Sequence, residues 1–156
     1  MEVVSVTQSN MRIYLNLLQA YEAEFSAITK KLPNQMGLFD LDTELVGATF
    51  GLLCYQDDKP IGLAAIKETE EARFEVCEFY IIPVMRNMLL GERFAHAIWQ
   101  LYPGQWKIKQ IANANKATEF WRKTIVNSNR TFTESVIEDN YWGLVTQQCF
   151  SSKQQD

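Results

Sequence analysis

The fold is decided by the stretch Glu78-Phe79-Tyr80-Ile81-Ile82-Pro83-Val84-Met85-Arg86-Asn87-Met88-Leu89-Leu90-Gly91-Glu92-Arg93. Its first half is rich in aromatic and β-branched residues, which favours a strand, and from Leu90 onward the apolar residues recur at helical spacing. A strand that turns through a short loop into a helix places free N–H groups and the positive end of the helix dipole at the helix start, where an anion such as phosphate can bind. Many turns of this kind bind nothing, so a purely structural interpretation stays open.

Short periodic segments lie on both sides of this stretch. Expected strands cover residues 3–6, 50–55, 60–67, 73–82, 106–112, 131–137 and 141–150, and expected helices cover 11–28, 40–46, 90–101 and 115–125, of which 40–46 has the weakest pattern. The order is strand, helix or helices, three strands, helix, strand, helix and two strands. One sheet with helices packed on it fits this order.

Length and composition indicate one globular domain. The 156 residues include 15 basic and 19 acidic side chains, for a net charge of −4, and 47% are hydrophobic. We expect a single domain over residues 1–150 and a polar tail over 151–156. Because no Lys/Arg cluster offers a footprint for a phosphate backbone, no nucleic-acid partner is expected. No long apolar segment is present, so we expect no membrane association and a cytoplasmic location.

The cysteines and the histidine exclude several kinds of site. Cys54, Cys77 and Cys149 are odd in number and form no C-x-x-C pair, so neither a disulfide framework nor a zinc ribbon is expected. His96 is the only histidine, which argues against Ser-His-Asp and Cys-His catalysis and against His-rich metal sites. No metal cofactor is therefore expected.

Three motifs resemble the GNAT superfamily of acyl-CoA-dependent N-acetyltransferases. The segment Arg86 to Gly91 falls on the family's Arg/Gln-x-x-Gly-x-Gly/Ala loop, and Asn115 to Trp121 approximates its Asn-x-x-Ala-x-x-Phe-Tyr helix. Tyr102-Pro103-Gly104-Gln105-Trp106, followed by Phe120-Trp121-Arg122-Lys123, is similar to a bacterial subgroup with Phe-Pro-Gly-x-Trp and Phe-Trp-Arg-Lys segments. The resemblance implies an α/β (α+β) fold, with a mixed, mostly antiparallel sheet of about seven strands flanked by about four helices.

The same resemblance implies a function and a set of site residues. The expected reaction is transfer of an acetyl group from acetyl-CoA, as cosubstrate, to a primary amine of a small molecule or peptide, in a chain that could act as a homodimer. In the family, acyl-CoA enters where the fourth and fifth strands diverge. The implied cofactor-binding residues are Ile81 and Ile82 for the pantetheine, Arg86, Asn87, Met88, Leu89, Leu90, Gly91 and Glu92 for the pyrophosphate, and Asn115, Phe120 and Trp121 for the CoA arm.

The motifs also depart from the family pattern. Leu89 stands where the loop has its first glycine, Asn87 and Met88 replace basic residues, and Trp121 stands where many members place a tyrosine that protonates the leaving thiolate. If the loop binds pyrophosphate, Leu89 must hold a backbone conformation that glycine adopts more easily, with its side chain turned away. The alternative function is a degenerate GNAT domain that binds a ligand or protein without transferring acetyl groups.

Glu78 is the expected catalytic base. Strict alternation places it on one strand face with Tyr80 and Ile82, where apolar neighbours should raise its pKa, and several GNAT enzymes keep a glutamate here. The alternative is a glutamate that faces solvent or pairs with an arginine, because a bulge would invert the alternation. Glu75, on the opposite face, is the reserve candidate. Cys77 is more simply a small core thiol than a nucleophile.

Overall fold

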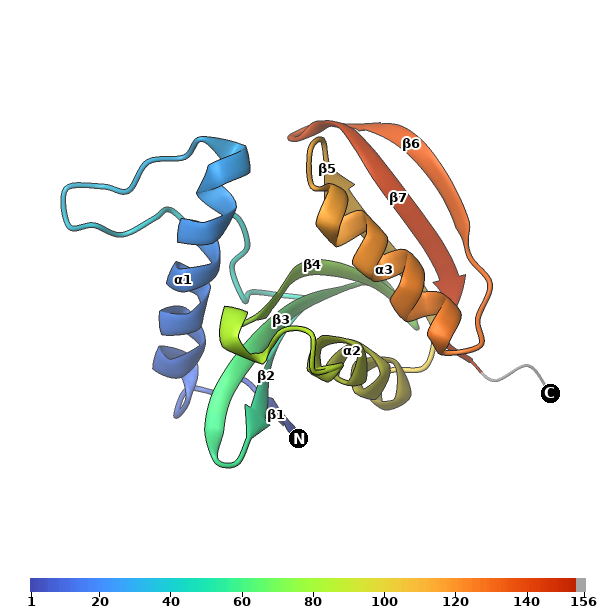
Figure 1. Cartoon of the computed structure of the whole chain (residues 1–156), viewed down its shortest axis with the longest axis horizontal. Coiled ribbons are helices and arrows are strands. Elements are labelled where there is room, and N and C mark those ends of the chain that lie inside the picture. Colours follow the sequence, from blue (N-terminus) through green and yellow to red (C-terminus); the bar gives the residue numbers. More distant parts are fainter. Residues whose placement is uncertain (154–156) are drawn as a thin grey trace. The chain divides into compact units, whose positions relative to one another are not determined.

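The computed structural model describes residues 1–153 and has the expected mixture of strands and helices (Figure 1). Its elements in chain order are β1 (Glu2–Ser5), α1 (Met11–Thr29), β2 (Thr49–Gln56), β3 (Lys59–Glu70), β4 (Arg73–Ile81), the 3-10 helix η1 (Pro83–Met85), α2 (Leu90–Leu101), β5 (Gln105–Ile111), α3 (Asn115–Asn127), β6 (Thr133–Asp139) and β7 (Gly143–Ser151). In this described part of the chain, none of the helices combines the length and apolar character needed to cross a bilayer.

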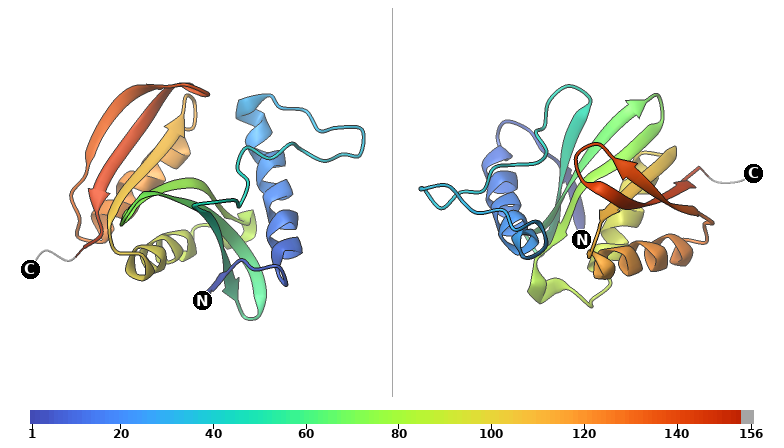
Figure 2. Two further views of the ribbon diagram at one scale, coloured as in Figure 1. Left: turned by 180° about the vertical axis from the view of Figure 1, so that it is seen from behind. Right: turned by 90° about the horizontal axis from the view of Figure 1, so that it is seen from above.

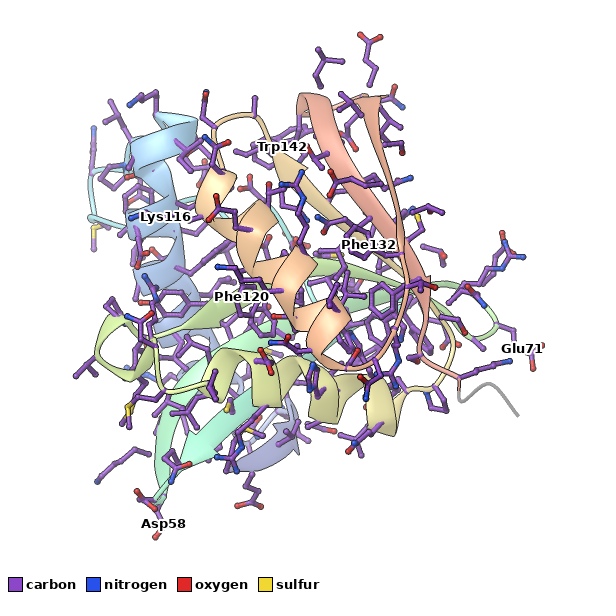
Figure 3. All side chains as sticks on the ribbon, turned by 45° about the vertical axis from the view of Figure 1, so that its right-hand side comes forward. Asp58, Glu71, Lys116, Phe120, Phe132 and Trp142 are labelled. Carbon is purple, nitrogen blue, oxygen red and sulfur yellow. The ribbon has the colours of Figure 1, made fainter. Side chains whose placement is uncertain are left out.

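The seven strands form one mixed sheet, as predicted. Their order is β1-β2-β3-β4-β5-β7-β6, so β7 lies between β5 and β6. β4 and β5 pair in parallel over Arg73–Val76 and Gln105–Ile108, whereas β1–β2, β5–β7 and β6–β7 pair antiparallel. A two-residue turn joins β2 to β3. Its residues Asp57 and Asp58 both have positive φ, as a type I′ hairpin turn requires, and Asp58 lies at the tip (Figure 3).

Residues Met1–Ile66 and Glu78–Gly91 form the first of two compact units. Tyr14 and Leu18, one helical turn apart on α1, pack against Leu53 of β2, Leu63 of β3 and Tyr80 of β4. This i, i+4 spacing produces the buried stripe of α1, and the strands supply the other side of the core.

Residues Lys67–Cys77 and Glu92–Asp156 form the second unit, of which the structure describes the part up to residue 153. Its core is aromatic: Trp99 of α2 packs edge-on against Phe150 of β7, and Phe74 of β4 stacks on Trp106 of β5. Ser151 ends β7, and Ser152 is buried, with its hydroxyl bonded to the Gly104 amide and the Trp106 indole. Of the predicted polar tail, residues 154–156 lie outside the described residues.

The predicted helix over residues 40–46 is wrong, so the described chain has three α-helices and one 3-10 helix. Figure 2 shows the segment between α1 and β2 as an extended loop. The Gln19 side chain accepts from the Phe39 amide (2.8 Å) and donates to the Phe39 carbonyl (2.9 Å), and Asp42 forms an ion pair with Lys31. These tertiary contacts hold the segment extended, which outweighs its weak helical pattern.

Candidate functional site

Glu78 lies near the C-terminal end of β4 in the first unit, and the residue is only 5% exposed. Tyr80 belongs to the core against α1, and Ile82 packs on the same core cluster. The Tyr21 ring of α1 contacts the Tyr80 ring edge-on, with ring centroids 5.9 Å apart. The expected alternation of residues 78, 80 and 82 therefore holds within this unit, and Glu78 faces α1 rather than solvent.

Two hydroxyl groups donate hydrogen bonds to the Glu78 carboxylate. The Thr43 hydroxyl lies 2.7 Å from Glu78 Oε1, and the Tyr21 phenol donates to the same side chain. The pKa of Glu78 is raised to about 7. Burial is the main cause and the nearby carboxylates of Glu22 and Asp42 add to it, whereas the two hydrogen bonds lower the pKa. A carboxylate with a pKa near 7 suits general-base work at neutral pH, because it is partly ionised and basic enough to accept a proton.

A partly buried ion-pair cluster adjoins the two residues that bond Glu78, because Glu22 follows Tyr21 and Asp42 precedes Thr43. The Lys31 ammonium is 3.0 Å from Glu22 Oε2 and 2.8 Å from Asp42 Oδ2, and it donates to the Asp40 carbonyl (2.9 Å). The Glu22 side chain is 1% exposed, and its Oε1 has no hydrogen-bond partner among the described residues. The cluster thus contains two carboxylates and one ammonium, and one carboxylate oxygen is unsatisfied.

Sequence reasoning missed the residues around Glu78, although one signal was available. Tyr14, Leu18 and Glu22 are four residues apart, and they are the three buried residues of α1. A glutamate that continues an apolar i, i+4 stripe is marked for burial, and a buried carboxylate needs partners. Thr43 gave no comparable signal, since its contact with Glu78 spans 35 residues of sequence.

The predicted phosphate-binding loop follows β4 in the same unit. Met85 and Arg86 donate their amides to the carbonyls of Ile82 (3.0 Å) and Pro83 (3.2 Å), so the Arg86 amide already has a partner. Among the described residues, the amides of Asn87, Met88 and Leu89 donate no backbone hydrogen bond. The loop therefore offers a short run of N–H groups directly before α2, in which Leu90 is buried and Gly91 half-buried.

The Arg86 side chain is engaged by the protein itself. Its Nε donates to the Ile81 carbonyl (2.9 Å), and its two terminal nitrogens donate to the two carboxylate oxygens of Glu24 (2.6 and 2.9 Å). The Ile82 amide likewise donates to the Ile61 carbonyl (2.9 Å). The Ile81 carbonyl and the Ile82 amide, two main-chain groups from the pair expected to bind pantetheine, thus have protein partners that a cosubstrate would have to replace.

Leu89 has the left-handed conformation that the loop motif requires, with φ of 57°, and its side chain is 67% exposed. This conformation costs leucine roughly 1–2 kcal/mol, whereas glycine adopts it freely.

We expect the substitution Leu89→Gly to raise the free energy of unfolding by up to about 1 kcal/mol. The relief of backbone strain exceeds the roughly 0.5–1 kcal/mol that glycine costs through chain entropy. Chemical denaturation measures the difference. Asn87→Gly is the matched control: Asn87 also has positive φ (64°), but asparagine tolerates it, so the gain should be smaller. A less stable Leu89→Gly protein would mean that the leucine side chain makes contacts worth more than the strain.

The other predicted cofactor residues lie in the second unit. Asn115 begins α3 and is exposed, and the half-buried Phe120 projects from the same helix as Lys116 (Figure 3). Trp121 is 5% exposed and packs against Trp99, with ring centroids 6.4 Å apart, so it is a core residue. The Glu92 carboxylate accepts a hydrogen bond from the side-chain amide of Asn127 (2.8 Å).

Glu75 and His96 are both bound by neighbouring groups. Glu75 forms ion pairs with Lys107 (2.7 Å) and Lys109 (3.2 Å) in the second unit. His96 Nε2 lies 2.8 Å from the Thr124 carbonyl, as expected for a satisfied mid-helix histidine. Of the two glutamates considered as bases, Glu78 is therefore the one without an ion-pair partner among the described residues.

Comparisons with known proteins support the fold through structure alone. No protein-family model and no curated protein matches the sequence. Among solved structures, the chain is similar to a GNAT-family acetyltransferase from Bacteroides thetaiotaomicron (TM-score 0.65, 14% identity), covering 100% of this chain and 89% of that one. It is also similar to a variant of spermidine N-acetyltransferase from Vibrio cholerae (TM-score 0.64, 11% identity, 97% and 95% covered).

A third similar structure is an acetyltransferase from Bacillus subtilis in complex with CoA (TM-score 0.61, 8% identity, 96% and 97% covered). The chain therefore has the fold of the GNAT acetyltransferases, as its motifs predicted. At these identities the likeness concerns the fold, and function must be argued from the site.

Proposed function

We propose that this chain, with its GNAT fold, is an acyl-CoA-dependent N-acyltransferase that moves an acetyl group from acetyl-CoA to a primary amine. The observation that carries the proposal is Glu78: a residue that is 5% exposed, whose carboxylate is held by two hydroxyl groups and has a pKa raised to about 7 by burial. A group with this basicity can take a proton from an ammonium at neutral pH, which is what an amine acceptor needs before it can attack.

In the proposed reaction, Glu78 accepts a proton from the acceptor ammonium and leaves a neutral amine. The amine nitrogen attacks the thioester carbonyl carbon and forms the new C–N bond. Collapse of the tetrahedral intermediate breaks the C–S bond, and the leaving CoA thiolate takes the second proton from the nitrogen, which gives the amide and the free CoA thiol. Positioning the two reactants in line can supply several kcal/mol of the rate enhancement.

For the cosubstrate, we propose that the amides of the loop between Arg86 and Glu92 bind the pyrophosphate, led by Asn87, Met88 and Leu89. The positive φ of Leu89 supports this assignment, because it is the conformation that a glycine in the motif would provide. The roles of Ile81, Ile82, Asn115, Phe120 and Trp121 stay predictions from the sequence resemblance. The same holds for the cytoplasmic location and a homodimer.

A degenerate domain that binds a ligand or protein without acetyl transfer is the second candidate. The observation that favours it is the Arg86 side chain, whose charge is already paired with Glu24 instead of being available to a phosphate.

A panel of primary amines with acetyl-CoA, read out by the release of free thiol, tests the proposal. We expect thiol release with at least one amine and a rise in melting temperature when acetyl-CoA alone is added, because a ligand that binds only the folded state stabilises it. A melting shift without thiol release from any amine would favour the degenerate domain. No shift at millimolar acetyl-CoA would contradict cosubstrate binding itself.

A further inference from the structure

We infer that Thr43 and Glu22 are positioning residues for Glu78, Thr43 through a hydrogen bond that orients one carboxylate oxygen and Glu22 through a buried negative charge close by. This inference rests on the proposed function, because it gives two residues a role in the orientation and ionisation of the proposed base. It adds a loop and a helix face that the sequence motifs do not include.

Thr43 reaches Glu78 from the extended loop between α1 and β2. Two contacts with α1 and its C-terminal end hold the loop: the paired hydrogen bonds between the Gln19 side chain and the Phe39 backbone, and the Lys31–Asp42 ion pair at 2.8 Å. Asp42 directly precedes Thr43, so the ion pair fixes the backbone next to the hydroxyl that donates to Glu78 Oε1 at 2.7 Å. The hydroxyl therefore arrives in a defined direction and favours one orientation of the carboxylate.

Glu22 has the opposite effect on Glu78, because it destabilises the ionised carboxylate. Lys31 binds one of its carboxylate oxygens, but the other, Oε1, is buried with no hydrogen-bond partner among residues 1–153, so its negative charge is compensated at one oxygen only. That charge disfavours a second negative charge on Glu78, whereas the Thr43 hydrogen bond favours it. Thr43 and Glu22 therefore shift the ionisation equilibrium of Glu78 in opposite directions.

The groups that face Glu78 come from two elements. Tyr21 and Glu22 belong to α1, and Asp42 and Thr43 belong to the loop, with Lys31 bound between the two carboxylates. Tyr21 and Thr43 stabilise the ionised form, while Glu22 and Asp42 destabilise it. Substitutions of Thr43 and Glu22 should therefore shift the ionisation of Glu78 in opposite directions, which a general structural disturbance would not do.

The experiment compares Thr43→Val with Glu22→Gln in the full chain. Valine keeps the shape of threonine but cannot donate, so the pH at which kcat/KM reaches half its maximum should rise. Glutamine at position 22 removes the negative charge and leaves Lys31 less neutralised. The pH at which kcat/KM reaches half its maximum should therefore fall. We expect shifts on the order of one pH unit in each case. Thr43→Ser should restore the wild-type profile, because serine keeps the hydroxyl.

Glu44→Gln is the matched control. Glu44 is exposed, follows Thr43 in the same loop and loses the same charge, yet it is not among the groups that influence Glu78, so its profile should not move. If Thr43→Val fails to fold, Glu22→Gln and Thr43→Ser still carry the test. Equal shifts in one direction for Thr43→Val and Glu22→Gln, or a shift in Glu44→Gln, would overturn the inference.

Infrared titration of the Glu78 carboxyl, assigned by its loss in Glu78→Gln, separates this inference from the proposed function. If the carboxyl titration does not move in either variant while Glu78→Gln abolishes turnover, the positioning roles are wrong and the proposed function stands. If the titration moves as expected but no amine releases thiol, the proposed function fails, and with it the catalytic meaning of the positioning.

Discussion

Glu78→Gln is expected to lower kcat for the best amine acceptor by two to four orders of magnitude while the dissociation constant of acetyl-CoA stays nearly unchanged. Glutamine keeps the shape of the side chain and can still accept hydrogen bonds from Thr43 and Tyr21, so only the basicity is removed. Loss of a positioned general base has an effect of this size. Steady-state thiol release and calorimetry give the two quantities.

Glu75→Gln is the control on the same strand. Glu75 is held by Lys107 and Lys109, so its loss should leave kcat close to that of the wild type. A large loss of turnover in Glu75→Gln together with full activity in Glu78→Gln would identify Glu75 as the base instead of Glu78.

The same Glu78→Gln substitution should make the protein more stable at neutral and alkaline pH. The unfolded chain releases the Glu78 proton near pH 4.5, whereas the folded chain releases it near pH 7, so between these values the folded state binds more protons. Wild-type stability therefore falls as the pH rises from about 4.5 to about 7, and glutamine removes this loss. The gain above pH 7 should be at most roughly 3 kcal/mol, and it should vanish below pH 4.

Urea denaturation of both proteins at pH 4 and pH 8 measures this difference. A gain in stability combined with a loss of turnover is the pattern of a residue kept for chemistry at the expense of folding. A Glu78→Gln protein that is less stable than the wild type at pH 8 would mean that the ionised carboxylate contributes contacts that outweigh its burial.

Gly62→Ala is expected to lower the free energy of unfolding by about 1–3 kcal/mol. A Cβ atom at Gly62 of β3 would clash with the Tyr80 carbonyl oxygen and lie 2.5 Å from the Ile81 side chain. A backbone carbonyl cannot move aside as a flexible side chain can, so β3 and β4 would have to separate locally, at the cost of overpacking.

Gly37→Ala provides the comparison for this prediction. A Cβ at Gly37 would meet no atom within 4 Å, but φ there is +75°, so alanine is disfavoured by the backbone alone. Gly37→Ala should lower the free energy of unfolding by about 1 kcal/mol and should leave Tyr80 undisturbed. Near-UV circular dichroism, which reports on the tyrosines and tryptophans, should change in Gly62→Ala and not in Gly37→Ala. Unchanged stability in Gly62→Ala would mean that the β3–β4 spacing adapts freely.

Much of the fold could be predicted from local pattern. The helix over residues 11–28 and the strand–loop–helix around residue 90 follow from spacing, and the structure places them at Met11–Thr29 and at the start of α2 at Leu90. The positive φ of Leu89 also followed from the loop motif. Each of these features depends on residues a few positions apart, so the periodicity carries the information.

The surroundings of Glu78 could be predicted only in part. Alternation along β4 placed its carboxylate on an apolar face, and burial raised its pKa as expected. The loop over residues 40–46 was predicted to be helical, because a weak local pattern was all that the sequence offered there. Contacts with Gln19 and Lys31, 20 and 11 residues away in sequence from Phe39 and Asp42, hold it extended instead.

The sequence alone therefore determined most of the elements, the sheet type and the choice of Glu78 as the candidate base, since these depend on periodicity and on short motifs. Only the tertiary structure decided which groups fix the orientation and the pKa of Glu78. Thr43, Tyr21 and Glu22 come to Glu78 across separations of 35, 57 and 56 residues, and the energies involved are those of burial and charge at short distance. Such interactions depend on where folding places the side chains, which no local pattern specifies.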